Sequence, residues 1–277
     1  MIQKPLFAPQ TEWIPPQDFP NLSNYPEISI DLETKDPNLK TMGSGSVTGR
    51  GEIVGIAVAV LDWSGYYPIA HEGGGNMDKK KVMSWFQEVL KTPAVKVFHN
   101  AMYDVCFIRA AGLKIEGYIV DTMIAGSLVD ENRFRYDLGS MGRDYVGKGK
   151  NEAVLKETAD VWGVDAKSEM YKLPAMYVGE YAEQDATLTL QLWQEMKKEI
   201  QHQDIQSIFE LECALFPCLV DMRFLGVRVD LEAATELKNK LSLQEKECLQ
   251  KVKKETGVDA QIWAARSIAQ VFEKLRL

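Results

Sequence analysis

Short runs of aliphatic and aromatic residues alternate with segments of helical periodicity between residues 27 and 120, and this alternation constrains the fold most strongly. The pattern predicts strands over residues 27–34, 52–60, 65–70, 95–99 and 118–120, and helices over residues 78–91 and 101–111. Strands connected through helices pack as a sheet between helical layers. We therefore expect an α/β fold with a mixed sheet in which the first, fourth and fifth strands are parallel.

The rest of the chain divides into an arm and a helical segment. Residues 1–26 hold six of the eleven prolines, which predicts an extended N-terminal arm. A long helix is expected over residues 179–201, and the first domain should span residues 27–202. Residues 203–277 then read as a separate helical segment, with helices near residues 205–225, 231–255 and 267–275.

Composition favours an intracellular protein that does not enter the membrane. The apolar run Ile53–Leu61 is too short to cross a bilayer, and the N-terminus lacks the pattern of a signal peptide. The four cysteines have no paired spacing, which favours reduced thiols over disulfides or a zinc site. We expect the chain to be cytoplasmic, in a bacterium or in a phage-infected host.

The first expected strand carries two carboxylates. Aliphatic residues alternate there with polar ones, so that Asp31 and Glu33 share one face and Ile28, Ile30 and Leu32 share the other. For a lone Asp-x-Glu pair, a solvated outer face is the commoner interpretation, and a metal site is the alternative.

A third carboxylate follows the fourth strand. Residues 95–99 run into a helix whose first turn contains Asp104. Open α/β sheets place functional groups at the carboxyl ends of strands. Taken alone, Asp104 could equally complement the positive end of the helix dipole.

The long helix supplies a tyrosine and a fourth carboxylate. Tyr181 and Asp185 are four residues apart and share a helix face, which Leu188 and Leu192 continue. A buried Tyr–Asp pair in a packing seam would be a purely structural alternative. That arrangement needs a partner for the carboxylate, and the sequence offers no arginine at a suitable spacing.

Together, these three segments resemble, in order and spacing, the motifs of the DEDD 3′–5′ exonuclease superfamily. The resemblance is to its tyrosine branch, because Glu180 stands where the other branch has histidine. Thr34, Asn100 and the pair Asp121-Thr122 also match. The resemblance implies a ribonuclease H-like mixed five-stranded sheet with flanking helices. It also implies a catalytic set formed by Asp31, Glu33, Asp104, Tyr181 and Asp185.

Electrostatics agrees with a metal site in such a family. Two carboxylates about 4 Å apart repel by roughly 4 kcal/mol at an effective dielectric constant near 20, so four need cations or large pKa shifts. Oxygen ligands favour Mg²⁺ or Mn²⁺, and the family implies two ions. By resemblance, Asp31 would bridge both ions, with Glu33 and Asp185 on the nucleophile's ion. Asp104 would act through water, and Tyr181 would orient the attacking water.

The resemblance extends past the nuclease motifs. Residues 209–230 and 265–277 are similar to the start of the thumb of family A DNA polymerases of the phage or bacterial polymerase I type. This implies a proofreading exonuclease that acts on single-stranded DNA 3′ ends, with polymerase palm and fingers in the same or a separate chain. No palm or fingers sequence follows, so we expect no nucleotide incorporation by this chain.

Two alternatives remain from the sequence. A ribonuclease D-like exoribonuclease shares the tyrosine-branch motifs, although we see no helical repeat of the RNA-processing type. A catalytically idle scaffold or DNA-binding module would be indicated by loss of a metal carboxylate, and all four are present. The net charge of −8 decides nothing, because a metal-dependent nuclease must itself concentrate carboxylates.

Candidate substrate contacts are less specific. Basic and aromatic residues mix over residues 133–136 and 143–156, as they do along single-strand tracks, although a solvated helical face would look similar. We expect His99 to support the end of the sheet and His71 to be a loop residue. The expected contacts are Thr34, Asn100, Tyr103, Arg133 and Arg135.

Overall fold

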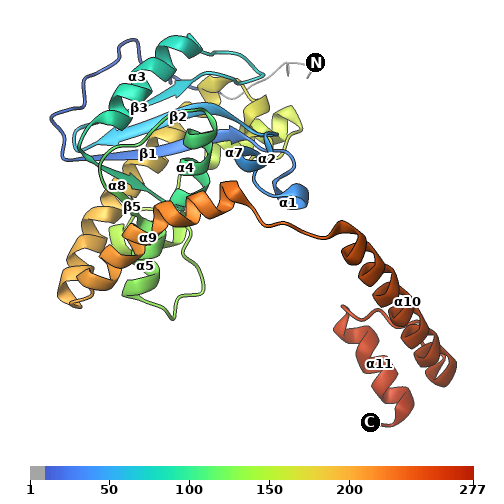
Figure 1. The fold of residues 1–277 in the computed structure, drawn as a ribbon. Coiled ribbons are helices and arrows are strands. Elements are labelled where there is room, and N and C mark those ends of the chain that lie inside the picture. Colours follow the sequence, from blue (N-terminus) through green and yellow to red (C-terminus); the bar gives the residue numbers. More distant parts are fainter. Residues whose placement is uncertain (1–9) are drawn as a thin grey trace. The chain divides into compact units, whose positions relative to one another are not determined.

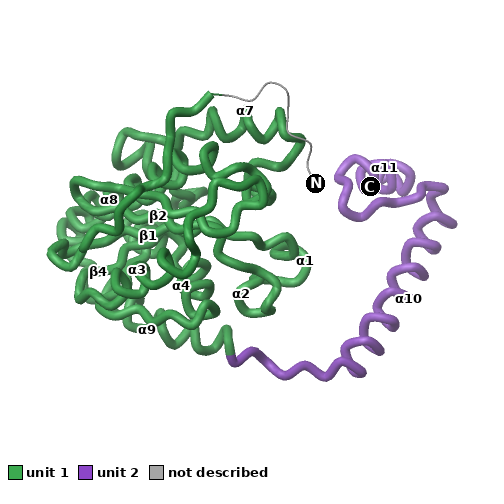
Figure 2. The backbone as a smooth tube through the Cα atoms, turned by 90° about the horizontal axis from the view of Figure 1, so that it is seen from above, with its two compact units in different colours: residues 1–224 green, residues 225–277 purple. Residues whose placement is uncertain are grey.

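The computed structural model describes residues 10–277, so the start of the proline-rich arm lies outside the described residues. The chain forms two compact units, one ending at Phe224 and the other spanning Leu225–Leu277 (Figure 2). Within the described residues, no helix has the length and apolar character needed to span a bilayer.

A five-stranded mixed sheet forms the centre of the first unit (Figure 1). Its spatial order is β3-β2-β1-β4-β5. β1 pairs antiparallel with β2. It pairs parallel with β4, and β4 pairs parallel with β5, so the first, fourth and fifth strands are parallel, as the sequence predicted. The strands are β1 (Glu27–Lys35), β2 (Glu52–Val60), β3 (Trp63–Pro68), β4 (Val95–Phe98) and β5 (Ile119–Asp121).

Helices surround this sheet and make up the second unit. Those of the first unit are α1 (Leu39–Met42), α2 (Gly45–Thr48), α3 (Lys79–Lys91), α4 (Ala101–Ala110), α5 (Thr122–Val129), α6 (Leu138–Met141), α7 (Ala153–Trp162), α8 (Gly179–His202) and α9 (Gln206–Leu225, whose last residue crosses the boundary). Short turns of other helical types are η1 (Gly142–Val146), η2 (Met170–Lys172) and η3 (Ala175–Tyr177). The second unit contains α10 (Leu231–Thr256) and α11 (Ala265–Leu275).

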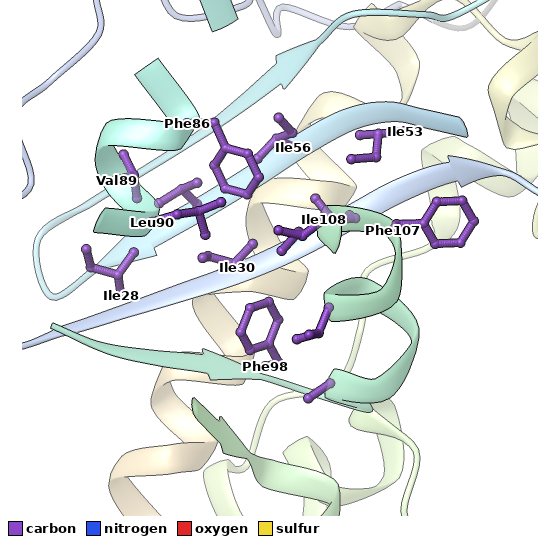
Figure 3. Packing of buried hydrophobic residues seen from close by; sticks show 14 of the residues in the cluster. Ile28, Ile30, Ile53, Ile56, Phe86, Val89, Leu90, Phe98, Phe107 and Ile108 are labelled. Atoms are coloured by element: carbon purple, nitrogen blue, oxygen red, sulfur yellow. The ribbon is translucent and has the colours of Figure 1, made fainter. Parts of the chain in front are cut away.

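One face of the sheet packs on α3 and α4 and forms the main apolar core. Ile28, Ile30 and Leu32 of β1 lie in the same buried cluster as Phe86 of α3 and Ile108 of α4 (Figure 3). Because side chains alternate along a strand, burial of these three aliphatics turns Asp31 and Glu33 toward the opposite face. The core thus fixes where the carboxylates point.

The opposite face is covered by α8, which contacts β1, β2 and β3. One buried cluster joins small side chains of the two elements, namely Ala57 and Ala59 of β2 with Ala182 and Ala186 of α8. Their small size permits close approach of the helix to the strand. The far end of α8 is tied to the first residue of β1, because Trp193 Nε1 donates to Glu27 Oε1 at 2.9 Å. This close docking brings the Tyr181–Asp185 face of α8 over the carboxylates of β1.

The division between the two compact units falls at residues 224/225, beyond residue 202, where the sequence predicts that the first domain ends. The physical reason is that α9 packs one full face on the first unit. Phe209 and Cys213 are buried with the α8 core, and Phe216 and Val220 with the core beneath α4. Only the remaining segment, with α10 and α11, forms a unit of its own, and neither of its helices buries a side chain completely.

The described part of the arm, residues 10–26, is irregular and held by aromatic contacts. Trp13 Nε1 donates to Glu183 Oε1 at 2.9 Å, and Phe19 stacks on Tyr67 with ring centroids 5.5 Å apart. Trp85 Nε1 donates to the carbonyl oxygen of Pro20 at 2.9 Å. The arm therefore braces β3 and α8, on which part of the site is built.

Candidate active site

The first pair of carboxylates stands at an irregularity of β1. Asp31 and Glu33 lie on the α8 side of the strand, and the pairing with β2 shifts directly after Glu33. Glu33 is opposite Gly55, where an added Cβ would lie 2.0 Å from the Tyr66 hydroxyl oxygen. Gly55 is required there because the Tyr66 side chain crosses over it. Bulges of this kind often re-aim side chains at active sites.

Asp104 is positioned by the junction between β4 and α4. Asn100 holds a left-handed conformation with φ 64°, which asparagine tolerates better than most residues. Asp121 stabilises this turn by accepting hydrogen bonds from the backbone N–H of Asn100 at 2.9 Å and of Ala101 at 2.8 Å. Asp104 then lies in the first turn of α4, and its Oδ1 accepts from the backbone N–H of Leu32 at 3.3 Å.

Tyr181 and Asp185 project from α8 toward the same place, together with a residue from a different segment. Lys150, between η1 and α7, forms an ion pair with Asp185. Its Nζ also donates to the Tyr181 hydroxyl at 3.1 Å and lies 5.2 Å from the centroid of that ring. The site is thus built from β1, α4, α8 and the loop that carries Lys150.

Burial and mutual repulsion disfavour the ionised form of these carboxyl groups, so their pKa values are raised. Burial, together with the charge of Asp185, raises the pKa of Asp31 to about 7. Burial and Asp31 raise the pKa of Glu33 and of Asp104 well above their usual range, and burial also raises that of Asp185. Ionising all four requires added positive charge.

The residues present suit a divalent metal ion in their chemistry. All four candidate ligands are carboxylates, the donors that Mg²⁺ and Mn²⁺ prefer. Asp185 Oδ1 is buried and has no hydrogen-bond partner within the described residues. Across residues 10–277, however, no three acidic, cysteine or histidine side chains stand close enough together to hold an ion as they are. Binding would therefore require small movements of the carboxylates.

A cleft of about 1250 Å³ opens over these groups. Asp31, Glu33 and Tyr181 line this cleft. Basic side chains from the segment between residues 135 and 167 line it as well, namely Arg135, Arg143, Lys150, Lys156 and Lys167. A cleft that combines a carboxylate cluster with basic side chains can accept a phosphodiester.

The structure brings four of the five expected substrate contacts to this cleft, namely Thr34, Asn100, Tyr103 and Arg135. Thr34 and Tyr103 are joined by a hydrogen bond of 2.8 Å between their hydroxyl oxygens. Arg133 does not line the cleft. It forms an ion pair with Asp144 and lies over the Tyr145 ring, 5.2 Å from its centroid.

Sequence reasoning missed two features of the site. Lys150 appeared only as one basic residue in a mixed stretch, and the glycines at 147 and 149 that surround it were the available signal. His71 lies in a loop, as expected, but its side chain is buried, and it links Tyr66 to the chain after α7. Its Nε2 lies 2.7 Å from the Tyr66 hydroxyl and its Nδ1 lies 2.9 Å from the Leu173 carbonyl oxygen.

Comparison with known proteins identifies the family of this chain. The profile of the 3′–5′ exonuclease domain of the DNA polymerase A type matches residues 18–201. A DNA-directed DNA polymerase of Pseudomonas phage M6 is 33% identical over 287 residues, which cover 99% of this chain and 43% of that protein. The chain thus spans less than half the length of this relative.

Two solved structures share the fold. The POL domain of Pol1 from M. smegmatis, in complex with a DNA primer-template and dNTP, superposes with a TM-score of 0.61 at 15% identity, over 91% of this chain and 38% of that one. Brucella melitensis NrnC with bound Mg²⁺ superposes with a TM-score of 0.53 at 17% identity, over 76% of this chain and 93% of that one. From the match of the domain profile to most of the first unit, this chain belongs to the 3′–5′ exonuclease domain family related to family A DNA polymerases.

Proposed function

We propose that this chain removes nucleotides from the 3′ ends of single-stranded DNA by metal-dependent hydrolysis of the phosphodiester bond. One observation carries the proposal. Asp31, Glu33, Asp104 and Asp185 come from three separate elements and converge beside a cleft with basic side chains, where burial and neighbouring carboxylates raise the pKa values of Asp31 and Asp104. Bringing four carboxylates together costs stability, and function is the usual compensation for such a cost.

These four carboxylates are the proposed ligands of two Mg²⁺ or Mn²⁺ ions. Asp104 and Asp185 are buried, and Asp31 and Glu33 are partly open to the cleft. When bound, such ions activate water for attack and stabilise charge on the leaving 3′ oxygen. The carboxylates would hold such ions, and they themselves lie at the carboxyl end of β4 and at the bulge of β1.

Tyr181 is proposed to orient the attacking water. Burial and the charge of Asp185 raise the pKa of Tyr181 far above its ordinary value. The phenol therefore keeps its proton at neutral pH, so it cannot act as a general base. Its hydroxyl can donate to the oxygen of a water molecule in the cleft and hold that water beside the scissile phosphate.

The basic residues of the cleft are proposed to bind the phosphate backbone. Arg135, Arg143, Lys156 and Lys167 lie along the cleft, and side chains of this type neutralise phosphates at low cost. The joined hydroxyls of Thr34 and Tyr103 offer further polar contacts in the same cleft. The net charge of −8 does not argue against phosphate binding, because the charges that line the cleft, and not the net charge, act on the substrate there.

The proposed context is proofreading in a family A DNA polymerase. The phage relative is a DNA-directed DNA polymerase, and this chain matches 43% of its length. We propose that palm and fingers, in the same or a separate chain, extend the DNA whose mispaired 3′ end this cleft trims. The helices α10 and α11 are proposed to correspond to the start of a polymerase thumb.

The test uses oligonucleotides of one sequence as single-stranded DNA, as a duplex with a frayed 3′ end, as a matched duplex and as RNA. With Mg²⁺ or Mn²⁺, a 5′-labelled single strand should shorten progressively, and chelation by EDTA should stop the reaction. Single-stranded and frayed DNA should be degraded fastest. Comparable or faster trimming of the RNA would favour a ribonuclease D-like activity, and no hydrolysis in any metal would favour an idle scaffold.

A further inference from the structure

Lys150 occupies a place in the site that the proposed reaction does not yet use. It lies in the segment Gly147-Lys148-Gly149-Lys150, between η1 and α7. Gly147 has φ 74°, and Gly149 carries no side chain to restrict its backbone. A lysine that follows such a segment can move its ammonium group without displacing a helix or a strand.

The ammonium of Lys150 is held by the site's own anions. It is paired with Asp185, whose side chain is 3% exposed, while the lysine side chain is 23% exposed. Its second partner is the Tyr181 hydroxyl, at 3.1 Å. Asp31 and Glu33 add attraction from farther away. Lys150 is thus the positive charge that partly neutralises the acidic cluster.

This position conflicts with a metal ion on the same carboxylate. Asp185 has one oxygen paired with Lys150 and one oxygen without a hydrogen-bond partner among the described residues. Two cations that share one carboxylate repel each other strongly where water is excluded. An ion held through Asp185 therefore competes with the ammonium of Lys150, and the ammonium has an open direction to move in, since Lys150 also lines the cleft.

We propose that Lys150 is an exchangeable cation, which pairs with Asp185 in the metal-free protein and moves to the scissile phosphate of the substrate when metal ions bind. The inference rests on the proposed function. Lys150 offsets part of the repulsion among the carboxylates before metal arrives. Afterwards the same charge stands in the cleft, where a phosphate oxygen is the anion available to it.

The first experiment measures Mn²⁺ binding without DNA, by calorimetry, for the parent protein, Lys150→Met and Lys156→Met. If the Lys150–Asp185 ion pair is open in about a tenth of the parent molecules, Lys150→Met should bind Mn²⁺ about tenfold more tightly, because its Asp185 is always free of the ammonium. Lys156→Met removes a positive charge from the same cleft but not from Asp185, so its affinity should stay close to the parent's. Without metal, Lys150→Met should also melt at a lower temperature, and saturating Mn²⁺ should remove this deficit.

The second experiment measures hydrolysis of single-stranded DNA at saturating Mn²⁺. Lys150→Met should lower kcat/KM by about 10- to 10²-fold, the loss expected for one charge-assisted hydrogen bond to phosphate. Lys150→Arg, which keeps a cation, should recover part of it. The proposal that Lys150 is exchangeable would be overturned if Lys150→Met bound Mn²⁺ with unchanged affinity. It would also be overturned if Lys150→Met bound Mn²⁺ more tightly but hydrolysed DNA at an unchanged rate. A parent protein that binds Mn²⁺ in the same way as Asp31→Ala would overturn the proposed function itself.

Discussion

Asp104 accepts a hydrogen bond of 3.3 Å from the backbone N–H of Leu32, the residue between Asp31 and Glu33. The bond ties the first turn of α4 to β1, so the protein itself keeps these three carboxylates together. It also uses only one oxygen of Asp104. The site is therefore assembled by folding, at an electrostatic cost that appears as raised pKa values of the buried carboxyls.

Replacing Asp104 by asparagine distinguishes the role of its carboxyl group in the reaction from its role in the hydrogen bond to Leu32. Asp104→Asn keeps an oxygen that can accept from Leu32 but removes the ionisable carboxyl group. We expect hydrolysis to fall by about 10²-fold or more. The melting temperature without metal should equal or exceed the parent's, because repulsion is relieved. Thermal denaturation and a single-strand degradation assay check both; a large loss of stability would make Asp104 a structural residue.

Tyr181→Phe keeps the aromatic ring and removes the hydroxyl that contacts Lys150. If the hydroxyl orients water, activity should fall by roughly 10- to 10³-fold. Stability should change little, because the ring still packs on the cluster around Leu155 and Met170. Rates measured over a range of DNA concentrations check the effect. An unchanged rate with a lowered melting temperature would instead make Tyr181 a packing residue.

Two truncations test the unit boundary. Residues 1–224 should fold and hydrolyse DNA, because every site residue and all of the buried face of α9 are kept. Residues 1–202 lose Phe209, Phe216 and Val220, whose burial contributes roughly 1.5–3 kcal/mol each. That loss is a large part of a typical folding free energy, so the shorter protein should melt much lower or aggregate. Equal melting temperatures would show that α9 is not needed by the first unit.

The pH dependence of stability should report His71. Burial lowers the pKa of His71 to about 4, whereas in an unfolded chain its pKa is near the ordinary 6.5. Between these values the unfolded chain binds a proton that the folded chain does not. The contribution of neutral His71 is therefore complete above about pH 6.5 and is lost as the pH falls toward 4, by up to about 3 kcal/mol.

His71→Gln provides the matched control. His99, whose pKa burial also lowers to about 4, remains in both proteins, so the difference between them isolates His71. Urea unfolding at several pH values should show a smaller loss of stability for His71→Gln between pH 6.5 and 4. Parallel curves for the two proteins would contradict the account of a buried neutral imidazole.

The sheet and the carboxylates could be predicted because their signals are local. The alternation around Asp31 and the spacing of Tyr181 and Asp185 each lie within one element. The contact between His71 Nδ1 and the Leu173 carbonyl oxygen joins segments 102 residues apart in the chain, so no local sequence pattern predicts it. Lys150 was missed for the same reason, since its partner lies 35 residues away.

The sequence did not indicate that the first compact unit continues through α9, because α9 carries apolar residues on more than one face. Phe209, Cys213, Phe216 and Val220 form its buried face, while Leu211 and Met222 are exposed. Apolar content alone does not reveal which of two faces meets the nuclease core. Only the packing against α8 and α4 decides it.

The most direct test of the central claim is hydrolysis by Asp31→Ala compared with the parent protein. Asp31 lies on β1 between Ile30 and Leu32, which belong to the apolar core, so the substitution should leave the fold intact. A 5′-labelled single strand with Mg²⁺ or Mn²⁺ should be degraded by the parent and not detectably by Asp31→Ala, and Asp185→Ala should behave in the same way. A folded Asp31→Ala protein that degrades the strand at a rate near the parent's would contradict the assignment of the metal-dependent site.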